Sequence, residues 1–452
     1  MSITALLCLL FCLCGSSLYA DWAHPEMVAK VASGEVREAR VSWWGFDAKD
    51  STKYLRAAIA SGVPKLIVDR MPSPWIVMPL RAVSNQHIVF EEGTVLLAKR
   101  GRFENISDRL MSLIEVENVR ITGYGAAFRM WRKDYAHGKD RKGCDYKRGE
   151  WRHALSMSGA RNVIVEGLTL EESGGDGIYV SNRGKEPCRN ITIRDCVCDR
   201  NHRQGISIIS AENLLVENCV FKNTKGAAPE DGVDFEPNNA NDRFVNCVMR
   251  NCVSENNAGN GFEIALSKSR KTTLPCSIRF ENCRTVGDSV GIKIRTRCRA
   301  TNGDYPTGSI SFDSCSVFKS RYEAVEIMQN PENAINVALT NCMFESIGMA
   351  NPDAPAVVLT SPFPDDPKPA MPDVVNLKWT DRGSRALSHY ATMNFAAIGE
   401  ETLPLRKAEI VDAEIVDLKP GDSVAGSPLQ FRRHLRLVAY ADRARRVKVH
   451  VR

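Results

Sequence analysis

The sequence predicts an all-β fold, a right-handed parallel β-helix in which short strands stack into long sheets. Three observations predict it. One strand type ends in a polar residue and a cysteine, a second strand follows about nine residues after each cysteine, and the unit recurs every 23 to 33 residues. A unit of this length without a helix cannot bury its own apolar face, so successive coils must cover one another.

The first strand type alternates apolar and polar residues and is plain in residues 190–196, 213–219, 278–283, 310–315 and 337–342. Its cysteines recur at one place in each unit, with residues 250–252 matching the ending. They are Cys196, Cys219, Cys252, Cys283, Cys315 and Cys342. A small, soft side chain at a fixed inward position indicates a buried ladder of free thiols rather than a catalytic or metal site.

The second strand type begins after a glycine or alanine, in residues 177–180, 205–208, 232–235, 261–264, 291–294 and 324–327. In residues 232–236 the apolar Val233 and Phe235 must point inward, so Asp234 and Glu236 must point outward. The same register predicts an outward column on successive coils, which contains Tyr179, Ser181, Ser207, Asp234, Glu236, Glu263, Lys293, Arg295 and Glu326.

The ends of the chain differ from the repeat. Residues 1–20 have the apolar stretch and the small residue before the cut that are typical of a signal peptide, so we expect an exported chain, periplasmic or extracellular. Residues 21–61 contain a predicted capping helix at 50–59, and the β-helix is expected over 62–365. A linker and a small β-rich module are expected over 366–452, and no segment is apolar enough to cross a membrane.

Composition indicates a globular chain, with 43% apolar and 25% charged residues and a net charge of +6. No run of like charges is long enough to indicate a nucleic-acid-binding tail, and we expect no nucleic-acid partner. The sequence leaves the oligomeric state open.

The middle of the outward column is acidic. Asp234 and Glu263 should lie one rung apart, about 4.8 Å between backbones, and Asp234 and Glu236 about 6.6 Å apart along one strand. Carboxyls this close raise one another's pKa, which suits a general acid beside a carboxylate, or an oxygen-ligated cation. The preceding turn, residues 226–231, is about four residues longer than its neighbours and adds Asp231. The alternative is a solvated acidic patch.

An insertion at residues 128–157 interrupts the coils and mixes aromatic with basic residues, a combination that suits sugar faces and anionic groups. Trp151, Arg152 and His153 at its end form its densest cluster of catalytic type. Asp176 precedes the next outward strand, and His202 follows one rung later, where it could face the same groove. The alternative is a solvated loop with a few anchoring aromatics.

With these motifs the chain resembles the right-handed parallel β-helix proteins of the pectin-lyase-like superfamily, over roughly residues 45–360. Residues 50–93 resemble the opening of many such enzymes, and residues 150–153, 173–178 and 231–237 resemble motifs of exported bacterial members that act on polysaccharides. The resemblance implies the fold and a polysaccharide partner, which could be anionic (uronate or sulfated). The superfamily includes hydrolases, lyases and epimerases, so the resemblance does not give the reaction.

Three functions follow. The leading hypothesis is a glycoside hydrolase without a cofactor. Its catalytic candidates are Asp234, Glu236, Glu263, Asp231 and Asp176, and its substrate-binding candidates are Trp151, Arg152, His153, Tyr179, His202, Lys293 and Arg295. The second is a polysaccharide lyase, with a Lys or His as base and with Asp234, Glu236 and Glu263 as a Ca²⁺ site. The third is a non-catalytic carbohydrate-binding or adhesive β-helix.

Overall fold

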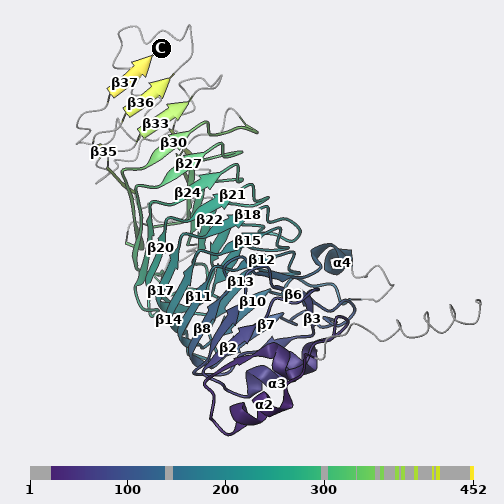
Figure 1. The fold of residues 1–452 in the computed structure, drawn as a ribbon. Helices are drawn as coiled ribbons and strands as arrows, with labels where there is room; N and C mark the ends of the chain where they lie inside the picture. Colours follow the sequence, from purple (N-terminus) through teal and green to yellow (C-terminus); the bar gives the residue numbers. More distant parts are fainter. Residues whose placement is uncertain are drawn as a thin grey trace, which may run out of the picture.

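The chain folds into a right-handed parallel β-helix with three long sheets and few helices (Figure 1). The computed structural model describes residues 22–137, 146–296, 304–331 and 333–351, and beyond these a series of strand segments between 357 and 451. Each coil runs from sheet C through sheet A to sheet B and back to sheet C. The predicted fold class is confirmed.

Every neighbouring pair of strands is parallel, and each sheet takes one strand from successive coils. Sheet A contains β1 (Glu38–Arg40), β2 (Lys65–Val68), β5 (His87–Phe90), β8 (Glu117–Thr122), β11 (Arg161–Glu166), β14 (Cys188–Arg194), β17 (Ala211–Glu217), β20 (Phe244–Arg250), β23 (Cys276–Glu281), β26 (Gly308–Asp313), β29 (Ile335–Thr340), β32 (Asp373–Val375) and β35 (Ile410–Val411). Sheet B contains β3 (Trp75–Val77), β6 (Val95–Ala98), β9 (Ala127–Arg129), β12 (Thr169–Glu171), β15 (Val197–Asp199), β18 (Val220–Lys222), β21 (Val253–Glu255), β24 (Arg284–Val286), β27 (Ser316–Phe318), β30 (Met343–Glu345), β33 (Lys378–Asp381), β36 (Glu414–Asp417) and β37 (Lys448–Val451). Sheet C contains β4 (Leu80–Arg81), β7 (Met111–Ile114), β10 (Leu155–Ser158), β13 (Ile178–Ser181), β16 (Ile206–Ile208), β19 (Val233–Phe235), β22 (Phe262–Ala265), β25 (Ile292–Arg295), β28 (Val325–Met328), β31 (Val357–Thr360) and β34 (Ala391–Asn394).

Two helices and a short 3₁₀ turn cover the first coils (Figure 1). They are α2 (Pro25–Ala32), α3 (Thr52–Ala60) and η1 (Val41–Trp44). The predicted helix at 50–59 is confirmed as α3, whose Leu55, Ala58 and Ile59 are buried. These helices shield apolar core and strand edges that the first coil would otherwise expose.

The cysteine ladder is also confirmed. All six repeat cysteines are buried and free. Each thiol donates to a backbone carbonyl of the preceding coil, as Cys252 Sγ does to Val216 O at 3.5 Å and Cys283 Sγ to Met249 O at 3.4 Å. Two further cysteines that do not belong to this ladder, Cys144 and Cys298, lie outside the described residues.

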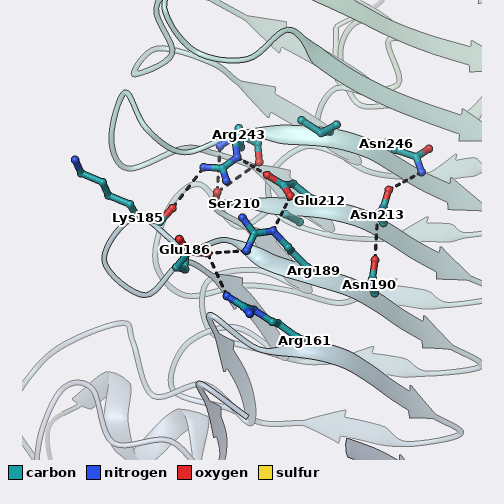
Figure 2. Close-up of polar contacts among 12 residues, drawn as sticks. Arg161, Lys185, Glu186, Arg189, Asn190, Ser210, Glu212, Asn213, Arg243 and Asn246 are labelled. Carbon is teal, nitrogen blue, oxygen red and sulfur yellow. Dashed lines mark hydrogen bonds and ion pairs between the residues drawn. The ribbon is translucent and has the colours of Figure 1, made fainter. Parts of the chain in front are cut away.

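A second ladder, of asparagines, runs along one edge of sheet A (Figure 2). Asn213 Nδ2 donates to Asn190 Oδ1 at 3.0 Å, and Asn246 Nδ2 donates to Asn213 Oδ1 at 3.0 Å. The ladder continues toward the N-terminus through Asn162, Asn118 and Asn85. All six have φ between 52° and 62°, a left-handed conformation that asparagine tolerates better than most residues.

The strands beyond residue 372 add further rungs to the same sheets, since β32 pairs with β29, β33 with β30 and β34 with β31. The strands of the predicted C-terminal β-rich segment therefore continue the β-helix, parallel to the strands of its last coils. The expected domain boundaries, at 20, 61 and 365, stay predictions.

Candidate active site

The candidate site lies on the outward face of sheet C, where the register is as predicted. Ser207 pairs with Asp234, Asp234 with Glu263, and Glu263 with Lys293. Glu326 continues the column, and Ser156 and Tyr179 extend it toward the N-terminus. Neighbouring carboxyls therefore stand on adjacent rungs of one sheet.

The central carboxyls point outward yet are not solvated. Asp234 is 1% exposed and Glu263 2%, and Asp231 is fully buried. The side chain of Glu236 remains 30% exposed. The turn from sheet B to sheet C has ten residues before β19 (223–232) and only six before β16 and β22 (200–205 and 256–261). A solvated acidic patch therefore does not describe these groups.

Two amide side chains hold the carboxyls in place. Gln204 Nε2 donates to Asp234 Oδ2 at 2.8 Å, while its Oε1 accepts the backbone N–H of Asp231 at 2.6 Å. Asn260 donates its backbone N–H to Asp231 Oδ1 and its Nδ2 to Glu263 Oε2 at 2.7 Å. Asp231 Oδ2 and Asp234 Oδ1 keep no hydrogen-bond partner among the described residues.

Burial raises the pKa of Asp234 well above its ordinary value, and the charges of Glu236 and Glu263 raise it further, while Arg203 opposes the shift. Burial likewise raises the pKa of Asp231, with Glu263 and Asp234 as the next causes. A raised pKa is the direction that a general acid requires.

Arg203 connects this cluster to a second one. Its Nη2 donates to Glu236 Oε2 at 3.3 Å, and its Nη1 lies 3.9 Å from Asp176 Oδ1. Asp176 is fully buried, which raises its pKa to about 7 although Arg203 lowers it. The site therefore contains three carboxyls with raised pKa beside one carboxylate, Glu236, that is paired with a guanidinium.

His153 belongs to this second cluster. Its Nδ1 accepts the backbone N–H of Asp176 at 3.0 Å and lies 3.3 Å from Asp176 Oδ2. Its ring stacks on Tyr179 with centroids 4.4 Å apart and planes 2° apart. Burial, followed by the charges of Arg109 and Arg203, lowers the pKa of His153 well below its ordinary value, so the imidazole is neutral. His153 thus orients Tyr179 from beneath the surface.

Arg152 and Trp151, the other two residues of the 151–153 cluster, differ in their exposure to solvent. Arg152 is fully buried and donates to Phe103 O, Glu104 O and Lys147 O, so it pins the insertion. The role of Arg152 in substrate binding stays a prediction. Trp151 is 42% exposed and stays available. Another part of the insertion forms α4 (Arg132–His137), where Arg132 Nη1 donates to Lys225 O at 2.7 Å. Residues 138–145 of the insertion lie outside the described residues.

The remaining substrate-binding candidates lie on either side of the central carboxyls, and they are Lys293, Arg295 and His202. Lys293 Nζ is 2.7 Å from Glu326 Oε2, and Arg295 Nε is 2.5 Å from Glu263 Oε1. His202 is 8% exposed, its Nδ1 is unpaired among the described residues, and burial lowers its pKa. In the described part of the chain no group of three or more His, Cys, Asp and Glu residues has the arrangement of a metal site.

Sequence reasoning did not assign roles to Arg203, Gln204 and Asn260. All three lie in turns from sheet B to sheet C, where no strand alternation indicates a direction. Their one sequence signal is position, two or three residues before an outward strand that carries a candidate carboxyl or its neighbour.

Comparisons with known proteins agree with this architecture. The family model described as "Right handed beta helix region" matches residues 112–239 and 142–304. The tailspike protein of E. coli bacteriophage HK620, solved with a pentasaccharide, aligns with a TM-score of 0.57 at 13% identity, over 85% of this chain and 72% of its own. An endo-xylogalacturonan hydrolase from Aspergillus tubingensis gives 0.54 at 12% identity, over 78% and 98%. The family model and these two structures agree on one fold, the right-handed parallel β-helix.

Two curated relatives of this β-helix come from Bacillus subtilis (strain 168) and carry no described activity. The SPbeta prophage-derived uncharacterized protein YorA is 25% identical over 181 residues, and the uncharacterized protein YclG is 32% identical over 96 residues. The matches cover 38% and 19% of this chain, and only 30% and 16% of those proteins. Among the described residues no helix has the length and apolar character needed to span a bilayer.

Proposed function

We propose that this chain is an exported polysaccharide-processing enzyme, a glycoside hydrolase that acts with the carboxyls of sheet C. One observation carries the proposal: Asp234, a buried carboxyl with raised pKa, stands on the same strand face as Glu236, a partly exposed carboxylate paired with Arg203. Two carboxyl groups with separate protonation states are what glycosidic hydrolysis requires.

In this mechanism Asp234 is the general acid and protonates the glycosidic oxygen of the leaving sugar. Glu236 is the partner carboxylate, which either activates water or attacks the sugar directly. Retaining enzymes place the two groups about 5 Å apart and inverting enzymes about 6.5–9.5 Å apart. Burial raises the pKa of Asp234 most, followed by the charges of Glu236 and Glu263.

The accessible side chains around these carboxyls would hold the sugar. Tyr179 offers a partly exposed ring fixed by His153, Trp151 offers an exposed ring, and Lys293 and Arg295 offer cations whose side chains are 23% and 20% exposed. The oligosaccharide bound by the HK620 tailspike and the substrate named for the Aspergillus hydrolase support a polysaccharide as the class of substrate. A cationic rim favours an anionic polymer.

The lyase alternative fits less well. A lyase needs a free base beside the uronate carbon, but Lys293 is paired with Glu326 and Arg295 with Glu263. His202 has an unpaired ring nitrogen and a lowered pKa, so it is the one candidate base that the geometry favours. A binding-only β-helix would not explain three buried carboxyls with raised pKa in one place.

An activity screen decides among these functions. The chain is incubated with neutral, uronate and sulfated polysaccharides, with and without EDTA, and both reducing ends and the ultraviolet absorbance of unsaturated uronates are followed. New reducing ends without that absorbance support the hydrolase. Absorbance that EDTA abolishes indicates a lyase with a cation at Asp234, Glu236 and Glu263, and turnover of no polymer indicates the binding function.

A further inference from the structure

A separate groove lies on the edge where sheet B turns into sheet C. Its volume is about 500 Å³. The lining residues come from three turns and are Asn223, Thr224, Lys225, Asn256, Ala258 and Arg321. None of the catalytic or substrate-binding candidates is among them, so the groove is not part of the site described above.

Two turns join the groove to the acidic cluster. The turn at 223–232 lines the groove with its first residues and carries Asp231 near its end. The next turn, at 256–261, lines the groove with Asn256 and Ala258 and supports Asp231 and Glu263 through Asn260. The groove therefore lies on the same coils as the carboxyls, at the beginning of the turns that lead to them.

The lining is cationic and contains no carboxylate. Arg321 lies across the turns, where its Nη1 donates to Gly287 O at 2.8 Å and its Nη2 donates to Asn257 O at 2.9 Å and Ala258 O at 2.6 Å. These acceptors are neutral carbonyls, and the charge of Arg321 also lowers the pKa of the buried Asp288. Lys225 is exposed and adds a second cation.

The groove also contains a polar atom that lacks a partner. Thr224 is fully buried, and among the described residues its Oγ1 has no hydrogen-bond partner. A buried hydroxyl left unpaired costs about 1–3 kcal/mol. A ligand with hydroxyl groups would remove this cost, and the amide of Asn256 offers a further donor and acceptor beside it. Asn223 Nδ2 donates to Asp199 Oδ1 at 2.8 Å, so Asn223 offers the ligand its amide oxygen.

We propose that this groove binds an acidic sugar residue, carrying a carboxylate or a sulfate, of the polysaccharide that the sheet C carboxyls process. The anion pairs with Lys225 and Arg321, and the sugar hydroxyls bond to Thr224 and the two asparagine amides. The polymer is thereby held on the same coils that cleave it. This inference rests on the proposed function for the identity of the polymer, but not for binding itself.

Binding is measured by calorimetry on the full chain carrying Glu236→Gln, so that no turnover is needed. The probes are tetragalacturonate for a carboxylate, a κ-carrageenan tetrasaccharide for a sulfate, and cellotetraose as the neutral reference. Two groove variants are compared. Lys225→Glu reverses one charge, and Thr224→Val removes only the unpaired hydroxyl and keeps the shape of the side chain.

The matched control is Lys185→Glu, the same charge reversal on an exposed lysine in the turn from sheet C to sheet A, at another corner of the helix (Figure 2). At least one acidic probe should bind about tenfold or more weakly to Lys225→Glu, since a charge-assisted contact is lost. Thr224→Val should weaken the same probe about two- to tenfold. Lys185→Glu should bind as the parent does.

The proposal is overturned if neither acidic probe binds, if cellotetraose binds as tightly as both acidic probes, or if the two groove variants bind like the parent. Which acidic probe responds tells the carboxylate from the sulfate. Because this readout needs no catalysis, a wild-type chain without hydrolytic activity would remove the proposed function and leave groove binding standing. A chain with hydrolytic activity but no groove binding would remove the groove proposal and leave the proposed function standing.

Discussion

At the scale of single residues, Arg203 connects the carboxyls of the site. Its guanidinium is paired with Glu236 and also lowers the pKa of the buried Asp234, against burial and the charges of Glu236 and Glu263, which raise it. Arg203 therefore limits how far the pKa of Asp234 rises.

Replacing Arg203 should change the kinetics of the reaction. In Arg203→Met the pKa of Asp234 should rise, because a positive charge that lowers it is gone, so the alkaline limb of the pH profile of kcat/KM should move to higher pH. Loss of the contact to Glu236 should reduce kcat about tenfold or more. Arg203→Lys should restore part of both effects, and an unmoved alkaline limb in Arg203→Met would argue against this role.

Asp288 gives a prediction on stability. Burial raises its pKa to about 7, although two hydrogen bonds from Asn257 to its Oδ1 oppose the shift. A raised folded-state pKa means that folding favours the protonated form, so the stability from this group is fully present below about pH 4 and is lost as the pH rises through about 7.

Asp288→Asn keeps the acceptor oxygen and cannot ionise. Relative to wild type it should therefore gain stability between pH 5 and pH 8, by an amount on the order of 2–4 kcal/mol. Urea unfolding at the two pH values measures this difference. A constant difference between the two chains would show that Asp288 does not titrate in this range.

The outward direction of Asp234, Glu236 and Glu263 could be predicted, because strand alternation fixes which side chains point away from the core. The burial of Asp234 and Glu263 could not. These two carboxyls bond to Gln204 and Asn260, which lie in turns, and the contacts of turns are set by packing between coils rather than by a local periodicity. The burial of Arg152 escaped prediction for the same reason, since its partner carbonyls lie up to 49 residues away.

At the scale of elements, the asparagine ladder shows how a local conformation and stacking between coils support each other. Asn213 has a φ of 56° and bonds to both Asn190 and Asn246. Repeated polar residues at these positions were visible in the sequence, but a left-handed residue within a strand is not indicated by alternation. The cysteine ladder was predictable because its residue type is rarer and its position is strictly periodic.

Two substitutions at Asn213 separate the contribution of the side-chain hydrogen bonds from that of the left-handed backbone conformation. Asn213→Gly loses the side-chain bonds but accepts the left-handed conformation, whereas Asn213→Ala loses the bonds and is also strained. We expect a loss of about 1 kcal/mol for glycine and about 2–3 kcal/mol for alanine, measured by denaturant unfolding. Equal losses in the two variants would mean that backbone strain contributes nothing at this position.

At the scale of the whole molecule, stability comes from the contacts of each coil with its neighbours. Phe280 shows this, because it is fully buried between the rings of two neighbouring coils. Its ring stacks on Phe312 of the next coil with centroids 4.6 Å apart, and it lies edge-on to Phe235 of the preceding coil with centroids 6.0 Å apart. The stacking was predictable from the repeat, as was the covering of the first coil by α3. The strands beyond residue 372 were predicted as β-rich, but their short, irregular spacing hid that they add further rungs.

Phe280→Ala should cost about 3–5 kcal/mol, because it leaves a cavity between three coils. Phe318→Ala removes the same atoms from a half-buried, outward position on sheet B and should cost clearly less. Thermal and urea unfolding of the two variants make the comparison. Equal losses would mean that stacking inside the helix is not what holds the coils together.

The central claim is that the carboxyls on the outward face of sheet C hydrolyse a polysaccharide, and the most direct measurement is the release of reducing ends by wild type, Asp234→Asn and Glu236→Gln. Glu217→Gln is the control, because Glu217 lies on sheet A and pairs with Arg250. The account predicts that both sheet C variants lose about 100-fold or more of the wild-type rate while the control keeps it. Wild-type rates in Asp234→Asn and Glu236→Gln would contradict it.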